Sequence, residues 1–217
     1  MSDVNTEKIV YFVRHGQSEG NITPIFQTLD SPLSDKGKKQ IESMAKRVAK
    51  LSFETLISSP LPRTKETAEA IARATDKIIE YSDLFVERIK PTGLAGKSYD
   101  DKEANKLWEK WEESLYTSGL RVVDGENFDD LILRADKALD FLKNRLEKEL
   151  VVVTHGYFLR TIIARVLLGD SLTEKNFKVF QSRASMENTG LSVITYSKRW
   201  EGMTWQLWIY NDHAHLG

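Results

Sequence analysis

The chain has 217 residues, which suits one large domain or two small ones, and no Pro-, Gly- or Ser-rich linker divides it. A hydrophobic content of 41% supports a substantial core, and a net charge of -1 lacks the basic excess typical of nucleic-acid-binding domains. Zero cysteines exclude disulfides and thiolate metal sites. No apolar run approaches the roughly 18 residues of a membrane span. Residues 1–7 lack the apolar region of a signal peptide, so we expect a cytoplasmic protein.

The first apolar run predicts a short strand that is buried on both faces. Residues 9–13 are apolar without interruption, a pattern typical of central strands in parallel sheets. The run ends at Arg14, His15 and Gly16, and the polar residues 17–32 predict a loop. Because ligands bind beyond the carboxyl ends of strands in open α/β sheets, this ending favours an anion site.

Two helices and two more strands are expected next in the chain. Ser34 is a suitable N-cap for a helix whose apolar residues recur at helical spacing as far as Leu51. Residues 55–58 predict a second strand, and Pro62 after it suits the first turn of another helix. Residues 77–81 predict a short third strand.

The middle of the chain predicts an irregular segment followed by two amphipathic helices. Residues 82–100 have no regular period and contain one proline and two glycines. Apolar positions recur at helical spacing over residues 101–116, and again from Phe128 to near Glu149.

A second buried strand with a similar ending is expected after the long helix. Residues 150–154 form this strand, which runs directly into His155 and Gly156. Residues 157–168 then predict a helix.

The last part of the chain predicts a hairpin and a polar tail. Residues 191–196 and 204–209 predict two strands, which we expect to form an antiparallel edge of a mostly parallel sheet. His213 and His215 have no third metal ligand nearby, so residues 211–215 predict a solvated tail rather than a metal site.

Four side chains suited to an anion are expected at one edge of the sheet: Arg14, His15, Arg63 and His155. The planar fork of arginine matches phosphate oxygens, and the glycines after both histidines let the backbone turn or approach a ligand. A histidine can also attack phosphorus and form a covalent phosphoenzyme, which divides one difficult step into two. The constellation predicts a pocket for a phosphoryl group.

Three motifs follow one another in the chain. They are Arg14-His15-Gly16, the Ser58–Arg63 segment followed by Glu66-Thr67-Ala68, and Val153-Thr154-His155-Gly156. Together they resemble the signatures of the histidine phosphatase superfamily, which includes the phosphoglycerate mutases. The resemblance runs from about residue 9 to residue 209.

The resemblance implies roles for the motif residues. It implies that His15 is the phosphorylated nucleophile and that no metal or other cofactor is needed. It also implies contacts with the substrate phosphoryl group from Arg14, Asn21, Arg63, His155 and Gly156. For Asn21 there is an alternative interpretation, an ordinary asparagine in a loop turn.

Relatives also use an acidic residue after the third strand to protonate the leaving oxygen. Glu87 fits this place, and a solvated loop glutamate is its alternative. Asp83, Asp100 and Glu126 are the nearest competitors for the role. After Glu87 the chain departs from the family pattern, because the loop formed by residues 89–96 is longer than usual and lacks an aromatic-glycine pair. This loop borders the substrate in relatives, so substrate specificity cannot be transferred.

We expect a single α/β domain over residues 1–217. Its architecture is a three-layer sandwich, with a mostly parallel central sheet, helices on both faces and a small helical cap from roughly 82 to 127. Within the cap, Trp108 and Trp111 are expected to pack rather than to stack on a substrate. The expected partner is a small phosphorylated metabolite, with neither nucleic acid nor membrane, and the chain is a monomer or a homodimer.

The expected function is metal-independent hydrolysis of a small-molecule phosphomonoester through a phosphohistidine. A phosphoglycerate mutase is the alternative, although true mutases carry a longer, more closely defined insertion after the acid. A non-catalytic phosphate-binding protein is a third possibility, but binding alone does not need a nucleophile such as His15. Phosphoprotein hydrolysis is less favoured, because family members that act on proteins usually lack a cap of this length.

Overall fold

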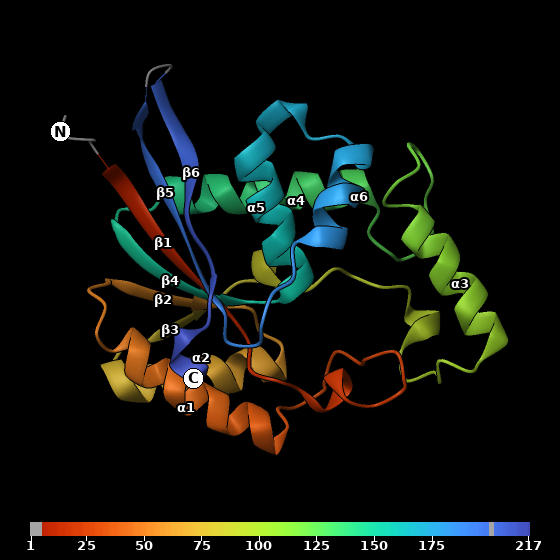
Figure 1. Cartoon of the computed structure of the whole chain (residues 1–217), viewed down its shortest axis with the longest axis horizontal. Coiled ribbons are helices and arrows are strands. Elements are labelled where there is room, and N and C mark those ends of the chain that lie inside the picture. The colour runs from red at the N-terminus through yellow and green to blue at the C-terminus, as the bar shows by residue number, and fades with distance from the viewer. Residues whose placement is uncertain (1–5, 200–201) are drawn as a thin grey trace.

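Six strands form one mixed sheet, and helices cover both of its faces (Figure 1). The computed structural model describes residues 6–199 and 202–217, so part of the polar N-terminus and the tip of the hairpin lie outside the described residues. The strand order is β3-β2-β4-β1-β5-β6. The strands are β1 (Thr6–Arg14), β2 (Thr55–Ser58), β3 (Ile79–Tyr81), β4 (Glu149–Thr154), β5 (Leu191–Arg199) and β6 (Gly202–Asp212).

The pairing of the strands confirms the expected α/β fold with a mostly parallel sheet. Strands β1 to β4 run parallel, whereas β5 pairs antiparallel with β1 and β6 pairs antiparallel with β5. Val153 of β4 lies opposite both Val13 of β1 and Ser58 of β2. The carboxyl ends of these three neighbouring strands therefore lie side by side.

The six α-helices include one that the sequence pattern did not predict. Helix α6 buries Phe177 and Gln181 and packs the partly buried Phe180 against the core, which is too little apolar surface for a periodic signal. Its N-terminus is fixed by a capping box between Thr173 and Asn176. The helices are α1 (Asp35–Val48), α2 (Pro62–Thr75), α3 (Lys102–Glu113), α4 (Phe128–Lys143), α5 (Gly156–Leu168) and α6 (Glu174–Arg183).

Helix α4 ends about six residues earlier than its apolar period suggested. Leu146, which continued that period, is 97% exposed. The chain has to turn here in order to enter β4, and the Nζ of Lys8 donates a hydrogen bond to the backbone carbonyl of Glu147 at 2.9 Å. The Arg145 side chain binds Glu80 at 2.8 Å, which fixes the turn beside β3.

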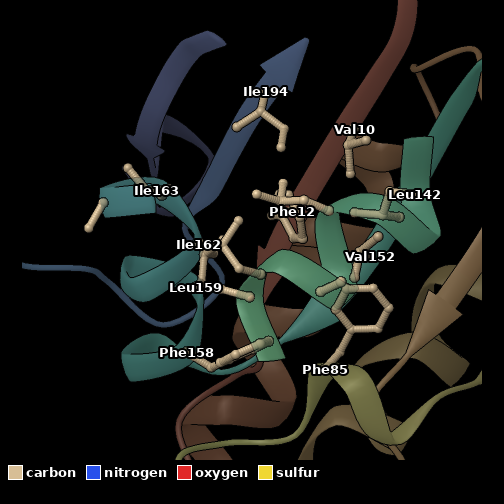
Figure 2. Close-up of a cluster of buried hydrophobic side chains, with 14 of the residues drawn as sticks. Val10, Phe12, Phe85, Leu142, Val152, Phe158, Leu159, Ile162, Ile163 and Ile194 are labelled. Carbon is tan, nitrogen blue, oxygen red and sulfur yellow. The ribbon is translucent and has the colours of Figure 1, made fainter. Parts of the chain in front are cut away.

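Both faces of the central strands are buried, as the uninterrupted apolar runs predicted. Figure 2 shows one face, where Phe12 of β1 and Val152 of β4 meet Leu159 and Ile162 of α5. The alternate residues of the same strands, such as Val153, face the layer formed by α1 and α2. This two-sided packing positions the strand ends rigidly.

The C-terminal residues are not a solvated tail. Residues Ala214–Leu216 form a short 3-10 helix that packs beside α1, and the C-terminus lies next to this helix in Figure 1. His213 is exposed as expected, but His215 is half-buried, and its Nε2 lies 2.9 Å from the Oγ1 of Thr189. The prediction was wrong for His215 because its partner is 26 positions away in the chain.

The described parts of the chain contain neither a membrane-spanning helix nor a cluster of metal ligands. Within residues 6–199 and 202–217, no helix is both long and apolar enough to cross a membrane. In the same ranges, no group of three His, Asp or Glu side chains is arranged to bind a metal ion.

Candidate active site

The ends of β1, β2 and β4 bring together the residues that the motifs singled out. The imidazole rings of His15 and His155 lie edge to face, with their centroids 5.1 Å apart. Arg63, in the first turn of α2, directs its Nε toward the Nε2 of His15 at 3.3 Å. All three side chains are buried, so the cluster lies below the surface at the sheet edge.

The hydrogen bonds of His15 define which ring nitrogen carries the proton. Its Nδ1 lies 2.6 Å from the backbone carbonyl oxygen of Gly16, which can only accept. Its Nε2 faces the Nε–H of Arg63, which can only donate. We therefore assign the proton to Nδ1 and a lone pair, which accepts from Arg63, to Nε2. Burial, together with the positive charges of Arg63 and Arg14, holds the pKa of His15 well below its ordinary value.

His155 has a similar environment and one unused nitrogen. Its Nε2 forms a 2.9 Å hydrogen bond with the hydroxyl of Ser59. Its Nδ1 is buried and has no hydrogen-bond partner among the described residues. Burial lowers the pKa of His155 well below the ordinary value, and the charge of Arg63 lowers it further.

Arg14 is packed tightly against the start of α5. A guanidinium nitrogen donates to the backbone carbonyl of Met186, while the Nε is buried without a partner in the described ranges. A Cβ at Gly156 would lie 2.9 Å from this Nε, which is closer than packing tolerates. Glycine at position 156 is therefore required by the close approach of Arg14.

The carboxylate of Glu87 is fixed at the N-terminus of α5. Its two oxygens accept the backbone N–H groups of Tyr157 at 3.2 Å and Phe158 at 2.9 Å. These are unpaired donors of the first helical turn, which stabilise a negative charge. Glu87 and Arg14 line the same cavity of about 220 Å³. The structure thus places this acid beside the arginine and histidine cluster.

Of the three competing carboxylates, only Asp83 lines a cavity together with Glu87, one of about 840 Å³ among the described residues. Glu126 forms a largely buried ion pair with Arg134 at 2.7 Å, and it also accepts the backbone N–H of Ile89 at 2.8 Å. Asp83 and Asp100 are exposed. Geometry therefore favours Glu87 for a role in proton transfer.

Asn21 is not in contact with the cluster in this structure. Its Oδ1 accepts hydrogen bonds from the backbone N–H and the hydroxyl of Ser18, both at 3.0 Å, which closes a turn. The residue also lines a cavity of about 530 Å³ under α3, together with Lys90 and Trp108. In the described parts of the chain, no hydrogen bond joins Asn21 to Arg14, Arg63 or either buried histidine.

The two tryptophans of α3 differ in their packing. Trp111 is 6% exposed, stacks under the guanidinium of Arg88 at 3.4 Å and donates its Nε1–H to the Glu126 carbonyl at 3.0 Å. The expected packing role is confirmed for this residue. Trp108 is 39% exposed, and both tryptophans line the 530 Å³ cavity.

Sequence reasoning did not single out two residues that the structure adds to the site. Ser59 forms a hydrogen bond with His155, as described above; it lies in the second motif, but the motif alone assigned it no role. Arg160 lines the cavity of Arg14 and Glu87, and it is fixed by the backbone carbonyls of Gln181 and Ala184. Arg160 follows Gly156 by one helical turn, a spacing that could have revealed it.

The fold and the cluster define an α/β protein with two buried histidines and two arginines at the ends of three parallel strands. The sequence profile of the histidine phosphatase superfamily (branch 1) matches residues 10–211. The chain therefore belongs to the histidine phosphatase superfamily.

Several relatives have names that indicate phosphoryl-transfer enzymes. The chain is 30% identical over 215 residues to a protein named probable phosphoglycerate mutase GpmB from Enterobacter sp. (strain 638), covering 95% of this chain and 94% of that one. It is 28% identical over 214 residues to the protein of the same name from Escherichia coli (strain K12 / DH10B), with the same coverage of both chains.

Solved structures share the fold over almost the whole chain. YhfR of Bacillus stearothermophilus has a TM-score of 0.77 at 24% identity, with 97% of this chain and 100% of that chain covered. The mycobacterial glucosyl-3-phosphoglycerate phosphatase in complex with VO3 has a TM-score of 0.75 at 21% identity, with 95% and 100% covered. At these identities the similarity concerns the fold.

Proposed function

We propose that this protein is a metal-independent phosphatase that hydrolyses a small-molecule phosphomonoester through a phosphohistidine on His15. The observation that carries the proposal is a set of three cations that form no ion pair in the described ranges, although the charge of Glu87 acts on Arg14 and Arg63. Among the described residues, Arg14, Arg63 and Arg160 form no ion pair. The buried Nε of Arg14 and Nδ1 of His155 also lack hydrogen-bond partners there. The oxygens of a phosphoryl dianion supply both the charge and the acceptors.

The proposed reaction has two steps. In the first, the Nε2 lone pair of His15 attacks phosphorus, the bond from phosphorus to the ester oxygen breaks, and Glu87 gives that oxygen a proton. In the second, water attacks the phosphohistidine, Glu87 takes the proton of the water, and inorganic phosphate leaves neutral His15. The arginines neutralise charge on the phosphoryl oxygens, which is the main requirement of phosphoryl transfer.

The segment 82–127 supports a small substrate. We propose one domain over residues 1–217 in which this segment is a cap, since α3 extends away from the sheet in Figure 1. A cavity of about 530 Å³ between this segment and residues 20–27 is within the size range of small-molecule sites. The proposed substrate is a small phosphorylated metabolite in the cytoplasm, bound by a monomer or a homodimer.

A phosphoglycerate mutase is the second candidate, and the names of relatives at 30% identity support it. The mutase would return the phosphoryl group to a sugar acid rather than to water. The unusual loop at residues 89–96 makes hydrolysis our first choice.

One experiment separates these functions. The purified protein is incubated with EDTA and a panel of sugar phosphates, nucleotides, phosphoglycerates and an aryl phosphate, and phosphate release is measured. We expect release that is lost in His15→Ala, and acid-labile, base-stable phosphate trapped on the wild type alone. Interconversion of 3- and 2-phosphoglycerate with negligible phosphate release would establish the mutase. Full activity in His15→Ala would refute the phosphohistidine mechanism.

A further inference from the structure

The backbone that carries the nucleophile is fixed by a segment from the other end of the chain. Thr189 lies between α6 and β5, is fully buried and has a φ of +59°. A β-branched residue rarely adopts this conformation, so the surrounding contacts must stabilise it. Its N–H lies 3.1 Å from the carbonyl of Arg14 and 3.2 Å from that of His15. The Nδ2 of Asn188 donates to the same His15 carbonyl at 3.1 Å.

His215 reaches Thr189 from the C-terminal 3-10 helix. Its Nε2 lies 2.9 Å from the Thr189 hydroxyl, and that hydroxyl donates to the Asn188 carbonyl at 2.6 Å. On its other side, the Nδ1 of His215 lies 3.3 Å from a guanidinium nitrogen of Arg47. Arg47, on α1, is in turn paired with Asp212.

Only one arrangement of protons satisfies this series of hydrogen bonds. Arginine can only donate, so the Nδ1 of His215 accepts and its Nε2 carries the proton. That proton is donated to the hydroxyl of Thr189, whose own proton goes to Asn188. His215 is therefore neutral, and burial beside Arg47 lowers its pKa in agreement. The hydrogen bonds thus connect the ion pair between α1 and the end of β6 to the backbone carbonyl of His15.

We propose that His215 and Thr189 are positioning residues for the nucleophile. Neither contacts the phosphoryl pocket; they act through Asn188 and the backbone of Arg14 and His15, which sets the direction of the His15 ring. The proposal rests on the proposed function of His15. A displacement of about 1 Å at a reacting group can cost about a hundredfold in rate. We therefore expect loss of these contacts to lower kcat by about tenfold to about a hundredfold and to leave KM nearly unchanged.

The test uses two matched pairs of variants. Thr189→Ala removes the hydroxyl, whereas Thr189→Ser keeps it; the two differ by one oxygen atom. His215→Ala removes the imidazole, and His213→Ala changes an exposed histidine two residues away. We expect Thr189→Ser and His213→Ala to retain wild-type kcat. Thr189→Ala and His215→Ala should lower kcat and the rate of phosphohistidine formation together, at temperatures below their melting points.

A second readout does not depend on turnover. The ¹⁵N resonances of the His15 ring are recorded for each folded variant without substrate, and we expect shifts in Thr189→Ala and His215→Ala only. Variants with lowered melting temperatures but unchanged kcat and unchanged His15 resonances would overturn the proposal. If His215→Ala does not fold, the Thr189 pair decides. If the wild type forms no phosphohistidine, the proposed function is wrong, and the resonances still report whether the contacts orient His15.

Discussion

The Nε of Arg63 and the Nε2 of His15 face each other at 3.3 Å, so an arginine binds the atom that we propose to be phosphorylated. Because a guanidinium only donates, this contact keeps the Nε2 lone pair of His15 unprotonated. The pKa of Arg63 is lowered to about 10 by burial, which still leaves it charged at neutral pH. Arg63 is therefore suited to orient the nucleophile before the substrate binds and to neutralise phosphoryl oxygens afterwards.

Removing Arg63 should slow all substrates alike. In Arg63→Ala we expect kcat/KM to fall by about 10²–10³, the usual effect of losing one donor to developing charge. Alkyl and aryl phosphates should lose the same factor, because Arg63 acts on the phosphoryl group that they share. Arg121→Ala is the control, since Arg121 pairs with Asp130 on the surface. A loss confined to one substrate class would contradict this role.

Removing the acid at Glu87 should depend on the leaving group. General acid catalysis contributes about 10²–10⁴-fold, and it matters most when a poor leaving group needs a proton. We expect Glu87→Gln to slow alkyl phosphates by a factor in this range and an activated aryl phosphate much less. Glu126→Gln, which breaks the ion pair with Arg134, should lower the melting temperature without this selectivity. Equal effects on both substrate classes would exclude Glu87 as the acid.

A methyl group at Gly156 should disturb the phosphoryl site through Arg14. The Cβ of Gly156→Ala would lie 2.9 Å from the Arg14 Nε, so the guanidinium has to move. We expect kcat/KM to fall by up to about a hundredfold, and inhibition by inorganic phosphate to weaken in parallel. In the control Gly93→Ala, the new Cβ meets only the flexible end of Leu107 at 3.0 Å. Wild-type inhibition by phosphate in Gly156→Ala would refute this explanation of the glycine.

The two buried histidines should make the free energy of unfolding depend on pH. Their folded pKa values are lowered well below 6.5, so the unfolded chain binds protons that the folded chain does not. Stability should therefore fall as the pH drops below about 6.5, with a slope for each histidine that rises toward about 1.4 kcal/mol per pH unit as the pH moves below 6.5. Urea unfolding between pH 6.5 and 5.5 measures this slope. In His155→Gln we expect this pH slope to decrease by the contribution of one histidine, and an unchanged slope would contradict the prediction.

The apolar runs were sufficient to predict the sheet and most helices. Residues 9–13 and 150–154 are buried on both faces, so their hydrophobicity identifies them without tertiary information. Helix α6 was not predicted, because it turns only a few apolar side chains inward, chiefly Phe177 and Phe180. The end of α4 was misplaced because exposed Leu146 continued the apolar period by coincidence.

The arrangement of the site could be predicted only as far as strand ends determine it. The sequence placed Arg14, His15, Arg63 and His155 together because each follows or ends a parallel strand. It favoured Glu87 as the acid but left Glu126 as a competitor, since only the fold shows that Arg134 binds Glu126. The contact of His215 with Thr189 has no local signature, because it depends on where the last residues return to the sheet.

Two residues near the ends of the segment 82–127, Ile89 and Glu126, are hydrogen-bonded to each other. The N–H of Glu126 donates to the carbonyl of Ile89, and the N–H of Ile89 donates to the Glu126 carboxylate, both at 2.8 Å. Exposed residues between them, such as 95–100, can therefore be exchanged without moving either anchor point, whereas Trp111 has to be kept because it donates to the Glu126 carbonyl at 3.0 Å. In evolutionary terms, we expect these two hydrogen bonds to let a lineage change its leaving-group preference by exchanging the exposed residues between Ile89 and Glu126. Glu87 lies outside the range between Ile89 and Glu126 and is bound to the N-terminus of α5, so such an exchange would retain the proposed proton donor.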